Sequence, residues 1–136
     1  MITSNEGPIS RSYASIAILG DFFYVLYGWN MDDMGPMDDI WKFDTINERW
    51  HEVEIDKNVE GYDLVARDSH AYAYYDGMIY MHGGYNVIGL NNSLVRLDMS
   101  AAVAKWEIVN YEQVRPSPRI HFSFEIFTTK AYLFGG

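Results

Sequence analysis

The sequence predicts an all-β fold made of four-stranded antiparallel units in tandem, the architecture of β-propeller blades. Short apolar runs alternate along the chain with turn-forming dipeptides such as Gly20-Asp21 and Asp76-Gly77. The same order of runs and turns recurs three times, the last time in part. Eleven tyrosines and four tryptophans favour strands, and no long segment repeats at helical spacing.

The unit at residues 67–110 shows the pattern most completely. Its predicted strands are residues 71–75, 78–82, 93–98 and 106–109. The first two flank Asp76-Gly77, a dipeptide typical of tight hairpin turns, and the second ends at the pair Gly83-Gly84. Together the four runs predict a four-stranded meander.

Three copies of this pattern align without gaps from Arg11, Arg67 and Arg119, which lie 56 and then 52 residues apart. Each arginine is followed by a tyrosine and then a glycine at constant spacing, and each complete copy adds an aspartate and a tryptophan. The signature residues are Tyr24, Gly28, Asp44 and Trp50, then Tyr80, Gly83, Gly84, Asp98 and Trp106, then Tyr132, Gly135 and Gly136. A period near fifty residues with about four strands per unit is typical of propeller blades.

This arrangement resembles the kelch repeat, with an Arg-led first strand, an apolar second strand ending in a glycine pair, an aromatic-Asp step and a spaced tryptophan. The resemblance covers nearly the whole chain, as two complete copies and the first half of a third. The first copy has Tyr27-Gly28 in place of two glycines, and Phe43 and Leu97 stand where the family usually has tyrosine. These conservative changes leave the predicted fold unaltered.

The repeat also sets the expected organisation of the chain. We expect a polar lead at 1–10, a first blade at 11–54, an inter-blade loop at 55–66, a second blade at 67–110, and a linker with half of a third blade at 111–136. Closed propellers have at least four blades, and kelch-like ones generally about six or seven. We therefore interpret the sequence as an arc of a larger propeller, either a fragment or a partial gene product. Self-association of copies through open blade edges is the alternative.

Each kind of signature residue has a physical reason. The glycine pair ends a strand where a Cβ would obstruct a close approach. Trp50 and Trp106 are large apolar plates suited to the space between neighbouring blades. Small residues such as Ala17 and Ala73 are expected where the innermost strands converge on an axis. His82 replaces an apolar residue in a second strand, and we expect it to be a hydrogen-bonded core histidine.

Composition narrows the classes of partner and chemistry. The formal net charge of −9 argues against nucleic acid or an anionic membrane as partner. The chain has no cysteine, which excludes disulfides and thiolate chemistry. Residues 1–8 lack the basic-then-apolar order of a signal peptide, and the apolar stretch at 16–27 is too short to span a bilayer. We therefore expect a cytoplasmic protein, with the nucleus as the alternative.

Antiparallel order predicts which loops share a face. The long loops at 29–38, 55–66, 85–92 and 111–118 lie on the side where the first strands begin, whereas those at 20–21, 76–77 and 128–129 are short and lie opposite. Binding usually resides in long loops on a rigid scaffold, so the long-loop face is the predicted site. The candidate partner-binding residues are Arg11, Tyr13, Trp29, Arg67, Ser69, Tyr85, Arg119 and His121.

The three arginines have two interpretations. Resemblance to kelch propellers that capture acidic peptides implies a role in ligand binding. The alternative, which we favour, is an ion pair or a carbonyl contact between blades. Asp32, Asp33, Asp38 and Asp39 lack the spacing of a calcium loop, and the four histidines lack metal-ligand spacing, so we expect no metal and no cofactor.

The sequence thus predicts a non-enzymatic kelch-repeat scaffold that binds a partner protein or peptide through its long-loop face. The alternative is a fragment of a kelch-type propeller enzyme acting on sugars or small molecules. No nucleophile–base order, paired carboxylates or phosphate-binding glycine loop appears in the sequence. The copper oxidase type of this fold uses a Tyr–Cys crosslink, which the lack of cysteine removes for this portion.

Overall fold

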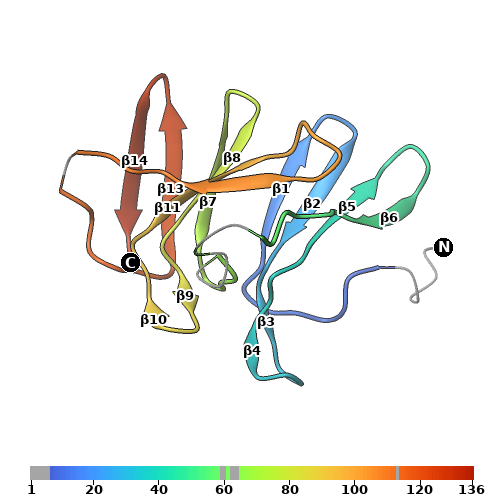
Figure 1. Ribbon diagram of the computed structural model, residues 1–136, viewed down its shortest axis with the longest axis horizontal. Coiled ribbons are helices and arrows are strands. Elements are labelled where there is room, and N and C mark those ends of the chain that lie inside the picture. The colour runs from blue at the N-terminus through green and yellow to red at the C-terminus, as the bar shows by residue number, and fades with distance from the viewer. Residues whose placement is uncertain (1–6, 59–60, 62–64, 113) are drawn as a thin grey trace.

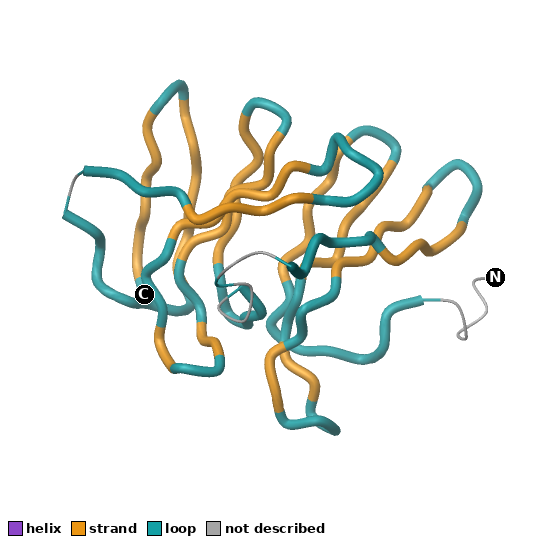
Figure 2. Tube along the Cα trace, in the orientation of Figure 1, coloured by secondary structure: helices purple, strands orange, loops and turns teal. Residues whose placement is uncertain are grey.

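The computed structural model describes residues 7–58, 61, 65–112 and 114–136. It shows antiparallel sheets side by side in an arc, with strands as the regular elements of the described residues (Figures 1 and 2). The predicted all-β architecture of propeller blades is confirmed. The described ranges contain no helix long and apolar enough to cross a membrane.

The first blade is a four-stranded sheet in the order β1-β2-β5-β6. Its strands are β1 (Ser15–Leu19), β2 (Phe22–Leu26), β5 (Ile40–Asp44) and β6 (Arg49–Glu52). The aspartate of the predicted aromatic-Asp step has a local structural role. One carboxylate oxygen of Asp44 accepts hydrogen bonds from the backbone N–H groups of Ile46 and Asn47. This side-chain bonding shapes the turn into β6.

The second blade repeats the first, and the third is a hairpin. The second blade contains β7 (Ala71–Tyr75), β8 (Met78–His82), β11 (Leu94–Asp98) and β12 (Lys105–Ile108), and the hairpin contains β13 (Phe122–Phe127) and β14 (Lys130–Gly135). In the second blade the sheet order is β12-β11-β8-β7. The tight turns predicted at 20–21, 76–77 and 128–129 join β1 to β2, β7 to β8 and β13 to β14.

Two of the four long segments predicted as loops contain small hairpins of their own. In residues 29–38 the strands β3 (Trp29–Asn30) and β4 (Gly35–Pro36) pair, and in residues 85–92 the strands β9 (Tyr85–Asn86) and β10 (Gly89–Leu90) pair. Both hairpins project on the side opposite the short turns (Figure 1). The long-loop face therefore carries ordered projections.

The main core lies between the first and second blades. The first blade contributes Ala17, Tyr24, Leu26 and Ile40, and the second contributes Ile79, Met81, Val95, Leu97 and Trp106. Trp106 is 3% exposed in this cluster, in agreement with the space-filling role expected of it. Trp50 is the equivalent residue of the first blade, but it lies on the face of that blade opposite the main core. There it packs on Phe23 and Phe43 with ring-centroid separations of 5.1 Å.

Backbone hydrogen bonds join each blade to the next at the end of its second strand. The N–H of Gly28 donates to the carbonyl of Arg67 at 3.1 Å, and the N–H of Gly84 donates to the carbonyl of Arg119 at 2.9 Å. A Cβ on Gly84 would lie 2.5 Å from a carbonyl oxygen, that of Asp68. The signature glycine is thus required by close packing of backbone on backbone.

Two buried histidines pack by their rings. His70 and His82 are 7% and 2% exposed, and their ring nitrogens have no hydrogen-bond partner among the described residues. The ring of His82 lies 5.7 Å from that of Phe122 and 5.9 Å from that of Phe124. The expectation of a hydrogen-bonded His82 was wrong, because aromatic contacts surround it instead. Burial, followed by the charge of Arg67, lowers the pKa of His70 to about 3 and that of His82 to about 4.

Candidate functional site: the long-loop face

The repeat arginines share one pattern of hydrogen bonds. In each, Nε donates to the carbonyl two residues earlier and Nη1 donates to the carbonyl sixteen residues later. The bonds to the later carbonyl measure 3.2 Å for Arg11, 3.1 Å for Arg67 and 2.9 Å for Arg119. Each guanidinium therefore ties the start of its first strand to the end of its second strand.

The outer part of each guanidinium differs between copies. Arg11 makes a bidentate pair with Asp39 at 2.6 and 2.9 Å, and Arg67 donates to Ser93 Oγ at 3.2 Å. Burial alone would raise the pKa of the Asp39 carboxyl, but hydrogen bonds from Arg11 and Trp41 outweigh burial and hold the pKa below its usual value. These side-chain bonds lie within one blade, which corrects the expected contact between blades.

The arginines also differ in accessibility. Arg67 is fully buried, whereas the hydrogen bonds of Arg119 are exposed to solvent. Burial lowers the pKa of Arg67 to about 10, so the buried guanidinium keeps its charge at neutral pH. Arg67 therefore influences the long-loop face indirectly, by holding backbone carbonyl groups in place.

Residues two positions after the arginines meet near the inner ends of the blades. Tyr13, Ser69 and His121 all have a left-handed backbone, with φ of 56°, 53° and 55°. The N–H of Ser69 donates to the carbonyl of Tyr13 at 3.2 Å, and the rings of Tyr13 and His121 lie 6.1 Å apart. The structure therefore brings three of the candidate residues together, one from each repeat. Repeated strain at a variable position suits an interaction surface.

Trp29 and Tyr85 form the bases of the two projecting hairpins. Trp29 exchanges backbone hydrogen bonds with Ser12 at 2.7 and 2.9 Å. Tyr85 exchanges the equivalent pair with Asp68 at 2.9 and 3.0 Å. Each hairpin is thereby fixed to the chain that enters the innermost strand of its blade. All eight candidate partner-binding residues belong to the long-loop side, but Arg67 is enclosed and the side chain of Arg11 is only 6% exposed.

Sequence reasoning missed the two asparagines that shape these hairpins. Asn30 Oδ1 accepts the N–H groups of Asp32 and Asp33 at 2.7 and 3.2 Å, and Asn86 Oδ1 accepts the N–H of Ile88 at 3.1 Å. Both asparagines are buried. They stand nineteen residues after the repeat arginines, so the same alignment contained the signal.

The hairpin tips are chemically distinct. The β3–β4 tip exposes Met31 and Met34 beside acidic residues, whereas the β9–β10 tip exposes aliphatic residues that include Val87, Ile88 and Leu90. Beside the second hairpin is a cavity of about 240 Å³ whose lining includes Ile88 and Leu90. Apolar side chains that cluster on a surface are typical of interaction sites, and methionine adapts easily to different partner surfaces.

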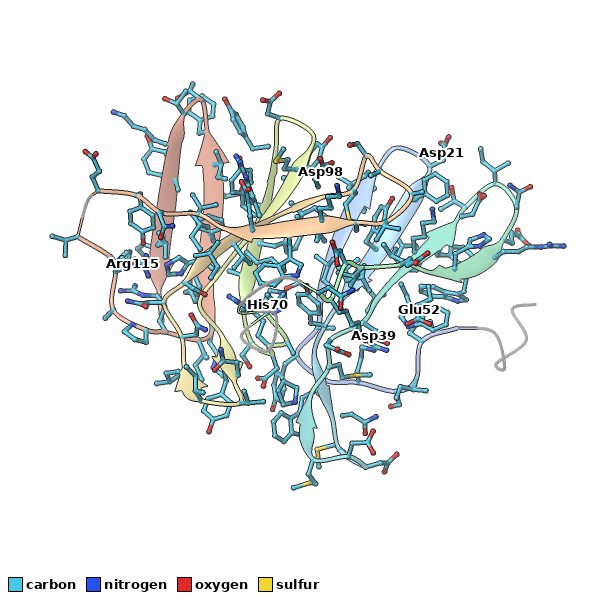
Figure 3. All side chains as sticks on the ribbon, viewed as in Figure 1. Asp21, Asp39, Glu52, His70, Asp98 and Arg115 are labelled. Carbon is cyan, nitrogen blue, oxygen red and sulfur yellow. The ribbon has the colours of Figure 1, made fainter. Side chains whose placement is uncertain are left out.

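Titratable side chains lie at different depths along the blades (Figure 3). Asp21 and Asp98 lie on the short-turn side, and Asp39 and His70 lie deeper in the arc. In the described part of the chain, no three His, Cys, Asp or Glu side chains are grouped so that they could hold a metal ion. The long-loop face thus presents ordered hairpins with apolar side chains at their tips, and no metal-binding cluster among the described residues.

The four-stranded blades are joined by backbone hydrogen bonds at their inner ends. This arrangement defines the chain as part of a β-propeller. A model of the KLHDC2/KLHL20/DRC7 Kelch-repeats domain matches residues 1–136, and the chain belongs to this kelch-repeat family. The chain is also similar in fold to the solved structure of YjhT, with a TM-score of 0.67 and 23% identity over 96% of the chain. It spans 36% of the YjhT chain. None of the curated proteins matches the sequence.

Proposed function

We propose that this kelch-repeat chain is a non-enzymatic interaction scaffold that binds a partner protein or peptide with its long-loop face. The observation that carries the proposal is the pair of anchored hairpins with exposed apolar tips. Residues Met34 and Ile88 stand at these tips, 68% and 75% exposed. Their bases are fixed by backbone hydrogen bonds, so binding would not have to order the loops first.

The chemistry of the tips indicates the kind of partner. A net charge of −9 disfavours nucleic acid and anionic membranes. Flexible methionines and aliphatic side chains suit an apolar patch on a protein, and the acidic residues Asp32 and Asp33 favour basic groups around that patch. A cytoplasmic setting, with the nucleus as the alternative, is part of the proposal and can be checked by imaging the tagged protein.

The experiment compares two sides of the same blades. The full chain is immobilised, and retained proteins are quantified for the wild type and for Met34→Asp, Ile88→Asp and Ile46→Asp. Ile46 is the matched control, because it is 70% exposed in the β5–β6 turn on the opposite side. The proposal is supported if one partner binds purified wild type and Ile46→Asp with the same affinity. The same partner must bind both hairpin variants at least tenfold more weakly. Equal loss with Ile46→Asp would contradict the proposal.

A further inference from the structure

The cavity of about 240 Å³ beside the β9–β10 hairpin is lined by two arginines, in a chain whose net charge is −9. Arg67 and Arg115 are the charged side chains among its described lining residues. They lie on the segments that enter and leave the second blade. The apolar part of the lining comes from the same blade and its hairpin, and consists of Ile88, Leu90, Val95, Trp106 and Ile108. Such a lining suits an apolar side chain that is accompanied by an acidic group.

Hydrogen bonds hold the walls of this cavity in place. Nη2 of the buried Arg67 donates to Ser93 Oγ at 3.2 Å. Nδ2 of Asn92 donates to the carbonyl of Pro116 at 3.0 Å, which ties the loop after the hairpin to the segment that carries Arg115. Because both sides of the cavity are fixed, a ligand can enter without first ordering them, and the entropy cost of binding is reduced.

Arg115 is exposed at the rim of the cavity, on the segment that leads to the third blade (Figure 3). Its Nη2 donates to Asn110 Oδ1 at 3.2 Å, and its guanidinium carbon lies 5.7 Å from the centre of the Tyr111 ring. These two contacts orient the guanidinium. A guanidinium has several N–H donors, so donors remain for a carboxylate, which it can bind through charge-assisted hydrogen bonds.

The cavity beside the β3–β4 hairpin has the opposite charge. Its volume is about 260 Å³, and its described lining includes Asp33, Asp38 and Asp39. Although Asp39 is paired with Arg11, the other carboxylates would repel an acidic ligand. The two hairpins occupy equivalent positions in the repeat, so the charge of the adjoining cavity distinguishes them. An acidic ligand therefore fits the β9–β10 side and is disfavoured on the β3–β4 side.

We propose that the cavity beside the β9–β10 hairpin is an anchor site for an extended segment of the partner protein in which an aliphatic residue is next to an acidic one. The aliphatic side chain contacts Leu90 and Ile108, and the carboxylate pairs with Arg115. This inference rests on the proposed function, because it names the chemistry of the partner that the long-loop face binds. It gives a ligand contact to Arg115, which lies outside the repeat signature.

The test titrates the full chain with the blocked peptide acetyl-Gly-Leu-Glu-Gly-amide and follows the methyl groups of the protein by NMR. We expect saturable shifts at Ile88, Leu90 and Ile108. A peptide with alanine in place of leucine should bind roughly tenfold more weakly, because less apolar surface is buried. A peptide with glutamine in place of glutamate should bind roughly threefold more weakly, because the ion pair at the exposed rim is lost.

Two protein variants locate the contact. The difference between the glutamate and glutamine peptides should vanish on Arg115→Gln and persist on Arg49→Gln, the matched control at an exposed position of β6. Ile108→Asp should abolish saturable binding, because it adds a carboxylate to the apolar lining, while the methyl spectrum of the first blade stays unchanged. The inference is overturned if the cavity methyl groups show no saturable shift, or if wild type binds the glutamate and glutamine peptides equally.

These outcomes can be separated from the test of the proposed function. A partner captured through the hairpin tips that binds Arg115→Gln as tightly as wild type would refute the anchor site and leave the scaffold function standing. Conversely, the proposed function fails if no partner depends on the tips. Binding of the glutamate peptide, with its loss on Arg115→Gln, would in that case still support a site for this ligand chemistry.

Discussion

Acid should destabilise this protein through a buried histidine. His70 is neutral in the folded chain, because burial and the charge of Arg67 lower its pKa from 6.5 to about 3. In the unfolded chain it titrates near 6.5. The unfolded state therefore binds more protons below pH 6.5, and the stabilisation present above that pH is lost progressively as the pH falls toward 3.

The size of the effect follows from the two pKa values. One unit of pKa difference corresponds to about 1.4 kcal/mol. Between pH 7 and pH 5, protonation of the unfolded chain at His70 alone lowers the free energy of unfolding by about 2 kcal/mol. His82 acts in the same direction, with its pKa lowered to about 4.

Urea unfolding at pH 7 and pH 5 measures this loss. His70→Phe removes the titrating group and introduces the residue that Phe122 provides at the equivalent position of the next repeat. We expect its loss between the two pH values to be about 2 kcal/mol smaller than that of the wild type. His51→Phe, at an exposed position of β6, is the matched control for the substitution itself. An undiminished loss in His70→Phe would refute the reasoning, whatever its stability at pH 7.

Three further predictions concern stability and are checked by the same unfolding measurement. Arg67→Met should cost about 3–5 kcal/mol, because it leaves buried carbonyls without their donor. Arg119→Met should cost much less, because the equivalent arginine is only half-buried, and equal costs would contradict the difference in burial. Gly84→Ala should be more destabilising than Gly77→Ala, because both have positive φ but only the former places a Cβ 2.5 Å from a carbonyl oxygen. Trp106→Ala should cost about 3–5 kcal/mol, and a cost below 1 kcal/mol would show that the inter-blade core does not depend on it.

Much of the architecture was predictable because its determinants are local. Turn dipeptides such as Asp76-Gly77 and cap residues such as Asp44 act over a few neighbouring residues, so each blade can be recognised from its own segment. The hairpins of the long-loop face were missed because Asn30 and Asn86 shape them through single side-chain oxygens. A hydropathy pattern contains no sign of such bonds, although the repeat alignment places Asn30 and Asn86 at equivalent positions.

The sequence by itself determined the number of repeats, the order of the strands and the side on which the long loops lie. Only the tertiary structure decided which equivalent residues are enclosed. Arg67 is buried and Arg119 is more accessible, and Trp106 lies between two blades whereas Trp50 lies on an outer face. The physical reason is that burial depends on what packs against each blade, and a pattern repeated in every copy contains no information about that packing.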